Sequence, residues 1–327
     1  MRFESICARA AVPLKRWKHA AKPLERCLGL SLSDAEREVV KAVCKTSGVH
    51  IGAYYYWYFQ KLLISRQVRR LRSSTNVRTV LHMDASNYSC LDRLPADGRG
   101  LLVATPHHGH YIFSIVAVAE RLSASRDVLV FYGNPETHAG NEVFDRLHQH
   151  LFSHENSRVT VIHDTRAGLA RALRGLQNGA AVIIMPDAFK NEHDTFLIPF
   201  CGRPMNVMLG TAALARKTNA RILPMTSCPT DTGLGFASVF GEVIEPCAAE
   251  MPAEDVLHAD YRVTLRMFEQ FESAMTPSLL HWQFIRSHFG RQGDFPQLSS
   301  DRAASAVELL FADPRVQLKD ITPVMVD

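Results

Sequence analysis

Histidines and carboxylates gather in two short stretches of this sequence, a combination suited to moving protons. The first stretch reads PHHGHY and contains His107, His108 and His110. A histidine held near a carboxylate is the usual arrangement for taking a proton from a hydroxyl or an amine. The alternative is that these side chains cap helices or hold loops in place. The second stretch reads PDAFKNEHD and contains Asp187, Lys190, Glu192, His193 and Asp194.

Both stretches follow apolar segments that have the pattern of β-strands. From Val77 onward such segments alternate with helical patterns, which is typical of a mostly parallel sheet flanked by helices. In an open α/β sheet, ligands bind beyond the carboxyl ends of the strands. We therefore expect the two loops to meet at one edge of the sheet. The predicted strands are Gly100 to Thr105, Asp127 to Tyr132, Arg158 to His163, Ala180 to Met185 and Arg221 to Thr226.

Helical patterns fill the intervals between these strands. A weaker hairpin is predicted over Gly233 to Ile244. We divide the chain into a helical N-terminal segment over residues 1–75, an α/β domain over 76–290 and a polar, irregular tail over 291–327. The predicted helices of the domain are Tyr111 to Ser123, Asn141 to Leu151, Thr165 to Gln177, Asn206 to Lys217, Pro252 to Met275 and Ser278 to His288.

The N-terminal segment shows a helical pattern from Asp34 to about Arg72, with Ser33 or Asp34 as its cap. Within it the run YYYWYF is followed by a lysine and several arginines. Aromatic rings combined with cations favour contact with a bilayer surface and its phosphate headgroups. Because the aromatic residues surround the helix, packing against the main domain explains them equally well.

The composition of the 327 residues, 46% hydrophobic and 21% charged, is that of an ordinary globular protein and excludes disordered and collagen-like classes. The formal net charge of +4 favours anionic partners without indicating nucleic acid. Seven scattered cysteines fit a reducing compartment. The first residues lack a signal-peptide core, and the apolar run from Tyr111 to Ala119 is about half the length that a bilayer crossing needs. We expect a cytoplasmic location, with peripheral attachment to the cytoplasmic face of the inner membrane as an option.

We also consider a metal site, a phosphate-binding loop and a cysteine nucleophile. The three histidines of the first loop could bind a metal, but adjacent histidines on a loop point apart and the HExxH pattern is missing. No glycine-rich phosphate loop of Rossmann or Walker spacing occurs in the sequence. Cys201 in PFCGRP could be a nucleophile, although a small buried residue is the commoner role. We therefore expect no metal site and no tightly bound cofactor.

Five blocks of the sequence resemble, in this order, one known family. They read DGRGLLVATPHHGHY, DVLVFY, GLARALRGLQNGAAVIIMPDAFK, TFLIPFCGRPMNVMLGTAALARKTNARILPM and LLHWQFIRSHF. Together they resemble the lipid A late acyltransferases, the lauroyl and myristoyl transferases of lipopolysaccharide assembly. The resemblance spans roughly Val77 to Phe289 and is closest from Phe196 to Met225. It implies a glycerolipid-acyltransferase-like α/β fold and transfer of an acyl group from a thioester to a hydroxyl or an amine.

In that family a histidine followed five positions later by Glu or Asp forms the catalytic dyad. His107 and Gly109 match the histidine and glycine of the motif, so the resemblance implies that His107 is the general base. Ile112 stands at the position of the acid. Three hypotheses compete: Asp187 supplies the carboxylate, His107 acts without one on an easily deprotonated acceptor, or the chain binds acyl groups without transferring them.

The resemblance also implies a thioester of acyl carrier protein or coenzyme A as the donor, and a lipid or small molecule as the acceptor. In the family's sheet, Arg166 and Arg203 would lie near the strand ends, where either could bind a phosphate of the donor. The amide end of a helix beginning at Asn206 could bind an anion too. We assign catalysis to His107 and Asp187, and substrate binding to His108, His110, Tyr111, Arg166, Arg203 and Asn206.

Two rival functions remain at this point: an acyl-binding homologue without catalysis, and a metal-dependent hydrolase that uses the three histidines. The family usually carries an N-terminal transmembrane anchor, and we find none in this sequence. We therefore consider an acceptor smaller than lipid A as well as a lipid acceptor. Candidates for the wall of an acyl groove are Ile112, Phe113, Val116, Met205 and Met208.

Overall fold

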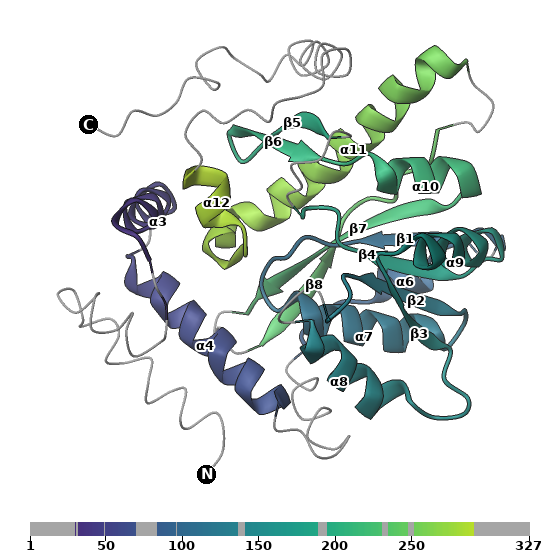
Figure 1. The fold of residues 1–327 in the computed structure, drawn as a ribbon, viewed down its shortest axis with the longest axis horizontal. Coiled ribbons are helices and arrows are strands. Elements are labelled where there is room, and N and C mark those ends of the chain that lie inside the picture. Colours follow the sequence, from purple (N-terminus) through teal and green to yellow (C-terminus); the bar gives the residue numbers. More distant parts are fainter. Residues whose placement is uncertain are drawn as a thin grey trace.

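The computed structural model describes residues 30, 32–48, 50–69, 84–95, 97–136, 141–188, 195–230, 235–247 and 252–290. At their centre lies a six-stranded sheet in the order β3-β2-β4-β1-β7-β8 (Figure 1). Its strand pairs are parallel except for β7 and β8, so the predicted α/β fold with a mostly parallel sheet is confirmed. The strands are β1 (Leu101–Ala104), β2 (Val128–Tyr132), β3 (Val159–His163), β4 (Ala181–Ile184), β7 (Arg221–Pro229) and β8 (Phe236–Phe240).

Helices cover both faces of the sheet because successive strand side chains point to opposite sides. Leu101 and Val103 pack in the cluster that contains α7 (Tyr111–Ser123) and α8 (Glu142–Phe152). Leu102 and Ala104 pack in the opposite cluster, which contains the buried residues of α9 (Arg166–Gln177), α10 (Gly210–Thr218) and α11 (Ala253–Met275). Strands buried on both faces are what a parallel sheet with crossover helices requires. The short α6 (Ser89–Asp92) precedes β1.

The helix predicted from Asn206 is wrong at its start. Asn206 and its neighbours lie in β6 (Arg203–Val207), which pairs antiparallel with β5 (Phe196–Phe200), and α10 begins only at Gly210. Cys201 and Gly202 make the reversal between these strands with φ values of 49° and 73°. Two positive φ values at adjacent positions are the mark of the tight turn that suits a two-residue hairpin. Asn206 therefore provides no helix N-terminus for an anion.

The helix predicted from Ser278 to His288 is interrupted. The 3₁₀ helix η1 (Thr276–His281) ends at Trp282, whose backbone is extended, and α12 (Ile285–Gly290) follows. Trp282 forms an antiparallel bridge with His108 in the loop after β1. The N–H of Gln283 also donates to the carbonyl of His107, with 2.9 Å between the two atoms. The extended residues thus replace a helical turn with bonds to the loop that carries the histidines.

The predicted hairpin is located differently in the structure. β8 pairs with β7 from Met225 opposite Phe240 to Pro229 opposite Phe236, so the hairpin uses the end of β7 as its first strand. Ile244 adds a single bridge to Ile222. β7 is longer than predicted because its second half pairs with β8 after its first half has paired with β1.

The N-terminal helical pattern forms two helices, α3 (Asp34–Thr46) and α4 (Gly52–Arg69). Ser33 caps α3 in a capping box with Glu36. Tyr54, Tyr55 and Trp57 of α4 are buried, so these aromatic residues pack against the protein. The side chains of the basic end of α4 and the residues after it, to Arg72, lie outside the described part. No helix of the described residues combines the length and the apolar character that crossing a membrane requires.

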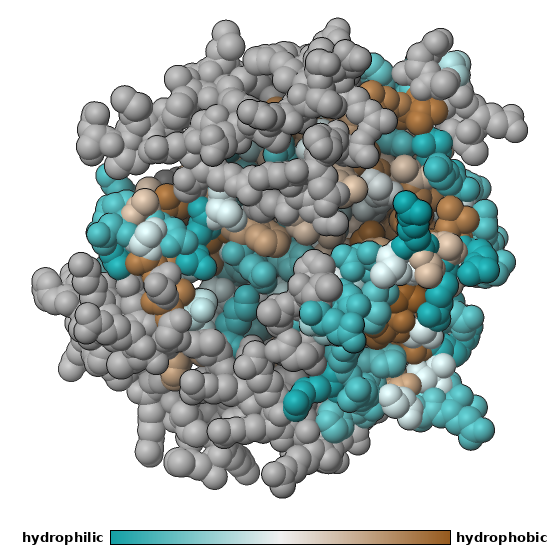
Figure 2. All heavy atoms as spheres, in the orientation of Figure 1, coloured by the Kyte–Doolittle hydropathy of each residue, from teal (hydrophilic) through white to brown (hydrophobic). Residues whose placement is uncertain are grey.

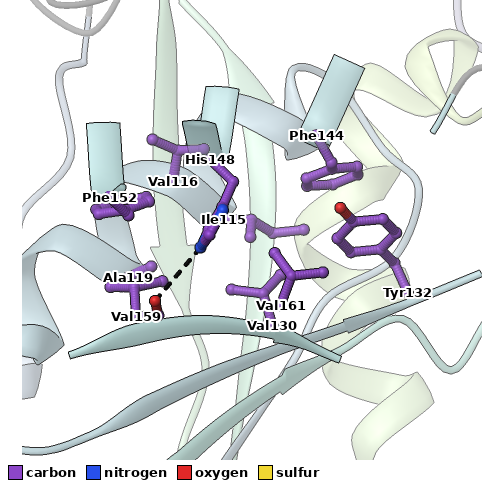
Figure 3. A pocket seen from close by; sticks show the side chains of 10 residues that line it. All are labelled: Ile115, Val116, Ala119, Val130, Tyr132, Phe144, His148, Phe152, Val159 and Val161. Atoms are coloured by element: carbon purple, nitrogen blue, oxygen red, sulfur yellow. Dashed lines mark hydrogen bonds between the residues drawn. The ribbon is translucent and has the colours of Figure 1, made fainter. Parts of the chain in front are cut away.

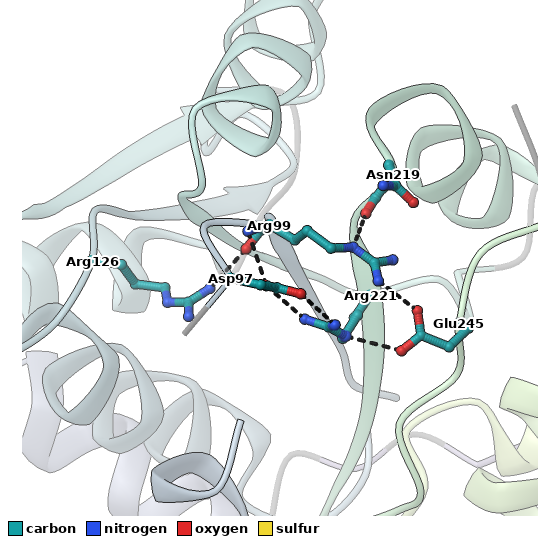
Figure 4. Close-up of polar contacts among 6 residues, drawn as sticks. All are labelled: Asp97, Arg99, Arg126, Asn219, Arg221 and Glu245. Carbon is teal, nitrogen blue, oxygen red and sulfur yellow. Dashed lines mark hydrogen bonds and ion pairs between the residues drawn. The ribbon is translucent and has the colours of Figure 1, made fainter. Parts of the chain in front are cut away.

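A network of charges joins the chain segments at the amino ends of β1 and β7, the opposite end from the two histidine and carboxylate loops (Figure 4). Arg221 binds Asp97 through two nitrogens, at 2.6 and 2.9 Å, and binds Glu245 at 2.9 Å. Arg99 forms a second ion pair with Glu245. The hydrogen bonds from Arg221 lower the pKa of Asp97 to about 2. This network holds the strand beginnings together while the other end of the sheet carries the polar loops.

A buried ion pair between α10 and α11 gives the first testable prediction. Arg216 and Asp260 form a bidentate pair at 3.0 and 2.9 Å, and their side chains are 12% and 7% exposed. Arg216→Met removes the partner of a buried carboxylate and should lower the free energy of unfolding by about 3–5 kcal/mol. Urea unfolding measures the change. The double variant Arg216→Met/Asp260→Leu should regain most of the loss, and an equally unstable double variant would contradict this account.

Candidate active site

The structure brings His107 and Asp187 together at the carboxyl ends of two neighbouring strands. His107 follows β1 and Asp187 follows β4, and these strands pair in parallel register with Ala104 opposite Ile184. Nδ1 of His107 lies 2.6 Å from Oδ1 of Asp187, and the backbone N–H of His107 donates to Oδ2 at 2.8 Å. Ring and backbone of one residue therefore bind the two oxygens of one carboxylate.

Asp187 is completely buried. Besides the two contacts with His107, its Oδ2 accepts a hydrogen bond from Nε1 of Trp282 at 2.9 Å. Three nitrogen donors thus compensate for the loss of water around a buried carboxylate, which would otherwise be costly. Trp282 supplies one of these donors, and the interruption between η1 and α12 places it there.

The contacts of His107 fix its tautomer and its orientation. Because an ionised carboxylate only accepts hydrogen bonds, Nδ1 carries the hydrogen and Nε2 keeps its lone pair. The ring packs edge-on between Tyr111 and Phe284, with centroid distances of 4.9 and 5.0 Å. Among the described residues none forms a hydrogen bond with Nε2, and the side chain is 15% exposed. His107 is thus oriented as a base with one accessible nitrogen.

His108 points away from His107 into the interior. It is fully buried, and its Nδ1 and Nε2 each lie 2.8 Å from a backbone carbonyl oxygen, those of Ser227 and Ser278. Burial lowers its pKa below the usual value. These contacts tie the loop after β1 to β7 and to η1. A contact between His108 and a substrate would require at least one of them to break.

His110 points to a third set of neighbours. Its ring lies 4.7 Å from that of Trp57 on α4, and the ring of Trp57 lies 4.2 Å from that of His281. Burial holds the pKa of His281 well below its usual value. His110, Trp57 and His281 therefore connect α4 with the loop after β1 and with η1.

Tyr111 lies beside His107 at the start of α7. Its hydroxyl donates to Oε1 of Gln283 at 3.2 Å, and burial raises its pKa, so the phenol stays protonated. Lys61 of α4 donates to the same oxygen at 3.3 Å. Tyr111 is therefore the predicted substrate-binding residue that contacts His107 directly.

The three other residues assigned to substrate binding are not joined to this pair. Arg166 is exposed at the start of α9, which follows β3, and two strands separate β3 from β1. Arg203 donates to the carbonyl of Phe289 at 2.6 Å, and burial lowers its pKa. Asn206 is buried in β6, where its Oδ1 has no hydrogen-bond partner among the described residues. No hydrogen bond or ion pair connects any of these three with His107 or Asp187 in the described part of the chain.

Parts of the sequence predictions fall outside the described residues. Lys190, Glu192, His193 and Asp194 of the second loop belong to this group. Within the ranges that the structure describes, no group of three His, Cys, Asp or Glu side chains is placed to hold a metal ion. Cys201 occupies the tight turn between β5 and β6, and burial raises the pKa of its thiol, which disfavours a thiolate nucleophile.

An apolar cavity lies between α7, α8 and the sheet (Figure 3). Its open space is about 10 Å³, which is about enough for one water molecule. The ring of Tyr111 lies 6.3 Å from that of Phe144, which stacks on Tyr132 at 4.8 Å, so the cavity begins one ring away from Tyr111. Val116 is the predicted groove residue that lines it. The lining residues are Ile115, Val116, Ala119, Val130, Tyr132, Phe144, His148, Phe152, Val159 and Val161.

The comparison with protein families identifies the family of this chain. Residues 2–291 match the model of the bacterial lipid A biosynthesis acyltransferases. The chain belongs to this family. The resemblance drawn from the sequence blocks is thereby confirmed, and membership indicates an acyltransferase of lipid biosynthesis that acts on a lipid acceptor. The comparison with curated proteins gave no match.

Sequence reasoning did not single out three residues that shape the site: Trp282, Gln283 and Phe284. They contact Asp187, His107 and Tyr111 from the connection between η1 and α12. The only signal for them was the block LLHWQFIRSHF, which supported the acyltransferase family resemblance as a whole. Nothing in its spacing indicates that the tryptophan donates to a buried carboxylate 95 positions away.

The position of Ile112 gives a second prediction. Ile112 is half-buried on α7 and packs against the apolar cluster of that face. Because Nδ1 of His107 is already bound to Asp187, Ile112→Glu should not raise turnover. A carboxylate in this apolar setting should instead lower the free energy of unfolding by about 1–3 kcal/mol. Ile112→Gln is the uncharged control. Increased turnover in a folded Ile112→Glu variant would contradict this prediction.

Proposed function

We propose that this chain transfers an acyl group from the thioester of acyl carrier protein or coenzyme A to a hydroxyl or an amine of a lipid or smaller acceptor. His107 is the general base in this proposal, and Asp187 is the carboxylate that supports it. The observation that carries the proposal is the 2.6 Å contact between Nδ1 of His107 and Oδ1 of Asp187. It favours the first of the three hypotheses raised by Ile112, in which the acid comes from another loop.

The chemistry follows from the tautomer of His107. Nε2 accepts the proton of the acceptor hydroxyl or amine while its oxygen or nitrogen bonds to the thioester carbonyl carbon. The bond between that carbon and sulfur then breaks, and the protonated imidazole returns the proton to the departing sulfur. Asp187 stabilises the positively charged ring between these steps. The products are an ester or amide and a free thiol, so the step needs no redox or metal cofactor to balance.

The apolar lining of the cavity suits an acyl chain, and because its open space is only about 10 Å³, the side chains of α7 and α8 would have to move apart to admit one. Its walls are hydrocarbon and aromatic side chains, which favour a saturated chain over a polar one. Its near end lies beside Phe144, which contacts Tyr111 of the site. In our proposal the thioester carbonyl lies at His107 and the acyl chain runs past Tyr111 toward the cavity.

We further propose that the reaction takes place on the cytoplasmic side, with the protein attached to a membrane surface where the acceptor is a lipid. The described cysteines, Cys44, Cys90, Cys201, Cys228 and Cys247, are free thiols, which fits a reducing compartment. Burial raises the pKa of Cys44 and Cys228 to about 11, so both stay protonated. Coenzyme A and acyl carrier protein thioesters act as co-substrates, and no tightly bound cofactor is part of the proposal.

Mass spectrometry of the reaction tests this function. The purified chain is incubated with acyl-coenzyme A or acyl carrier protein thioesters of several lengths and with candidate lipid and amine acceptors. Transfer produces an acylated acceptor and one equivalent of free thiol. A bound thioester that is never transferred would favour the acyl-binding alternative. Thioester or ester hydrolysis that depends on an added metal would favour the hydrolase.

A further inference from the structure

Lys61 of α4 stands at the border of the proposed site without an ion-pair partner among the described residues. Its ammonium donates to Oε1 of Gln283 at 3.3 Å, and the Tyr111 hydroxyl donates to the same oxygen. The backbone of Gln283 is bonded to the carbonyl of His107. Lys61 is therefore separated from His107 by a single residue, although 46 positions separate them in the sequence.

A second cation lies near Lys61. The guanidinium of Arg286 on α12 pairs with Glu36 of α3 at 3.0 Å. Burial and the nearby charge of Arg286 lower the pKa of Lys61 to about 8. Among the described residues, two cations and one carboxylate thus leave one positive charge uncompensated in a half-buried setting. An unpaired charge in such a setting is costly unless an anion neutralises it.

The face of the molecule near α4 and α12 is hollowed. Figure 2 shows a recess in this face of the molecule between the positions of α4 and α12, and hydrophilic side chains are visible within it. Lys61 on α4 and Arg286 on α12 come from the two helices that border the recess. The helix α4 and the residues just before α12 also contact the loop of His107, through Trp57 and through Gln283.

We propose that Lys61, assisted by Arg286, binds a phosphate group of one of the two substrates at the border of the His107 site. This rests on the proposed function, because both the acyl thioesters and most lipid acceptors carry phosphate near their reacting groups. Lysine binds phosphate as a mobile point charge, and a charge-assisted hydrogen bond is stronger than a neutral one. The phosphate replaces the Gln283 oxygen as the principal partner of Lys61.

Binding measurements on the full chain test the proposal without requiring turnover. Lys61→Met removes the charge and keeps most of the side-chain volume, and Lys61→Arg keeps the charge. Lys217→Met removes a lysine charge from an exposed position on α10 and serves as the matched control. Calorimetry compares coenzyme A with pantetheine for the donor. Vesicles containing phosphatidate are compared with vesicles containing diacylglycerol for the acceptor.

We expect Lys61→Met to weaken binding of one phosphorylated probe by about ten- to hundredfold and to leave its phosphate-free partner unchanged. Weaker binding of coenzyme A identifies the donor as the source of the phosphate, and weaker binding of phosphatidate vesicles identifies the acceptor. Lys61→Arg and Lys217→Met should stay near the affinity of the unmodified chain. If Lys61→Met folds poorly, competition by inorganic phosphate against the probe is measured on the unmodified chain and on Lys61→Arg.

The proposal is overturned if neither phosphorylated probe is weakened in a folded Lys61→Met variant. It also fails if the phosphate-free probes are weakened equally, or if inorganic phosphate does not compete. These results are independent of catalysis. A chain that binds phosphate through Lys61 and transfers no acyl group would contradict only the proposed function, and active transfer with unchanged binding in Lys61→Met would contradict only the phosphate site.

Discussion

His107→Ala is expected to lower turnover by about a hundredfold or more while the protein stays folded. The imidazole is the only described group that combines an oriented ring with an accessible basic nitrogen beside the bound carboxylate. Its removal leaves acceptor deprotonation to water. The ring is partly exposed and sits at the end of β1, so its loss should cost little packing. Single-turnover assays with a saturating thioester measure the chemical step.

Two comparisons make this result specific. His154→Ala removes an exposed histidine after α8 and should retain the activity of the unmodified chain. His108→Ala removes the buried ring between the carbonyls of Ser227 and Ser278, so it should lower the free energy of unfolding by about 1–3 kcal/mol. Its turnover per folded molecule should fall less than that of His107→Ala. A folded His107→Ala variant with normal turnover would exclude His107 as the base.

The central sheet could be predicted from the sequence because its strands are buried on both faces. A continuous apolar run such as GLLVAT or AAVIIM has no helical period and is bounded by turn residues, which defines β1 and β4 to within one residue at each end. The alternation of strands and helices then indicates a parallel sheet. A parallel sheet places the loops after neighbouring strands together, and this logic correctly anticipated that the loops of His107 and Asp187 meet.

The secondary-structure predictions that were wrong concern segments whose conformation depends on distant contacts. The stretch from Asn206 to Lys217 is predicted as one helix, but its first residues pair with β5 across the turn at Cys201 and Gly202. The turn holds a cysteine with positive φ, which few sequence patterns indicate. Trp282 interrupts another predicted helix because its indole reaches Asp187 and its backbone bridges to His108. Tertiary bonds override the local helical preference at both positions.

The pairing of His107 with a carboxylate also depends on a distant contact that the sequence does not show. The resemblance to lipid A acyltransferases identifies His107 and the isoleucine at the position of the acid, and it leaves open how the histidine is supported. Only the structure shows that the carboxylate next to Nδ1 comes from the loop after β4. The sequence offers several acids after β4, and nothing in their spacing ranks Asp187 above the others. Only the resemblance to the family singled out Asp187, because it matches the aspartate of a Pro-Asp pair in that family.

The identity of the supporting carboxylate can be tested by removing its charge without changing its shape. In Asp187→Asn the amide has one oxygen and one NH₂ group. The position of Oδ2 accepts two N–H groups, from the backbone of His107 and from Trp282, so the amide oxygen must occupy it. The NH₂ group then faces Nδ1 of His107 at the position of Oδ1. It donates a hydrogen bond to Nδ1, so the ring of His107 carries its own hydrogen on Nε2.

Asp187→Asn is therefore expected to lower turnover by about 10² to 10⁴-fold, because the tautomer that it stabilises cannot accept a proton at Nε2. Nitrogen NMR of the His107 ring should show the hydrogen on Nε2 in the variant and on Nδ1 in the unmodified chain. Trp282→Phe is the matched control, because it removes one donor from Oδ2 and keeps the carboxylate. It should retain turnover within about tenfold, since the charge facing Nδ1 is unchanged. A folded Asp187→Asn variant that keeps normal turnover, with the hydrogen still on Nδ1, would show that His107 works without Asp187, as expected for an acceptor that loses its proton easily.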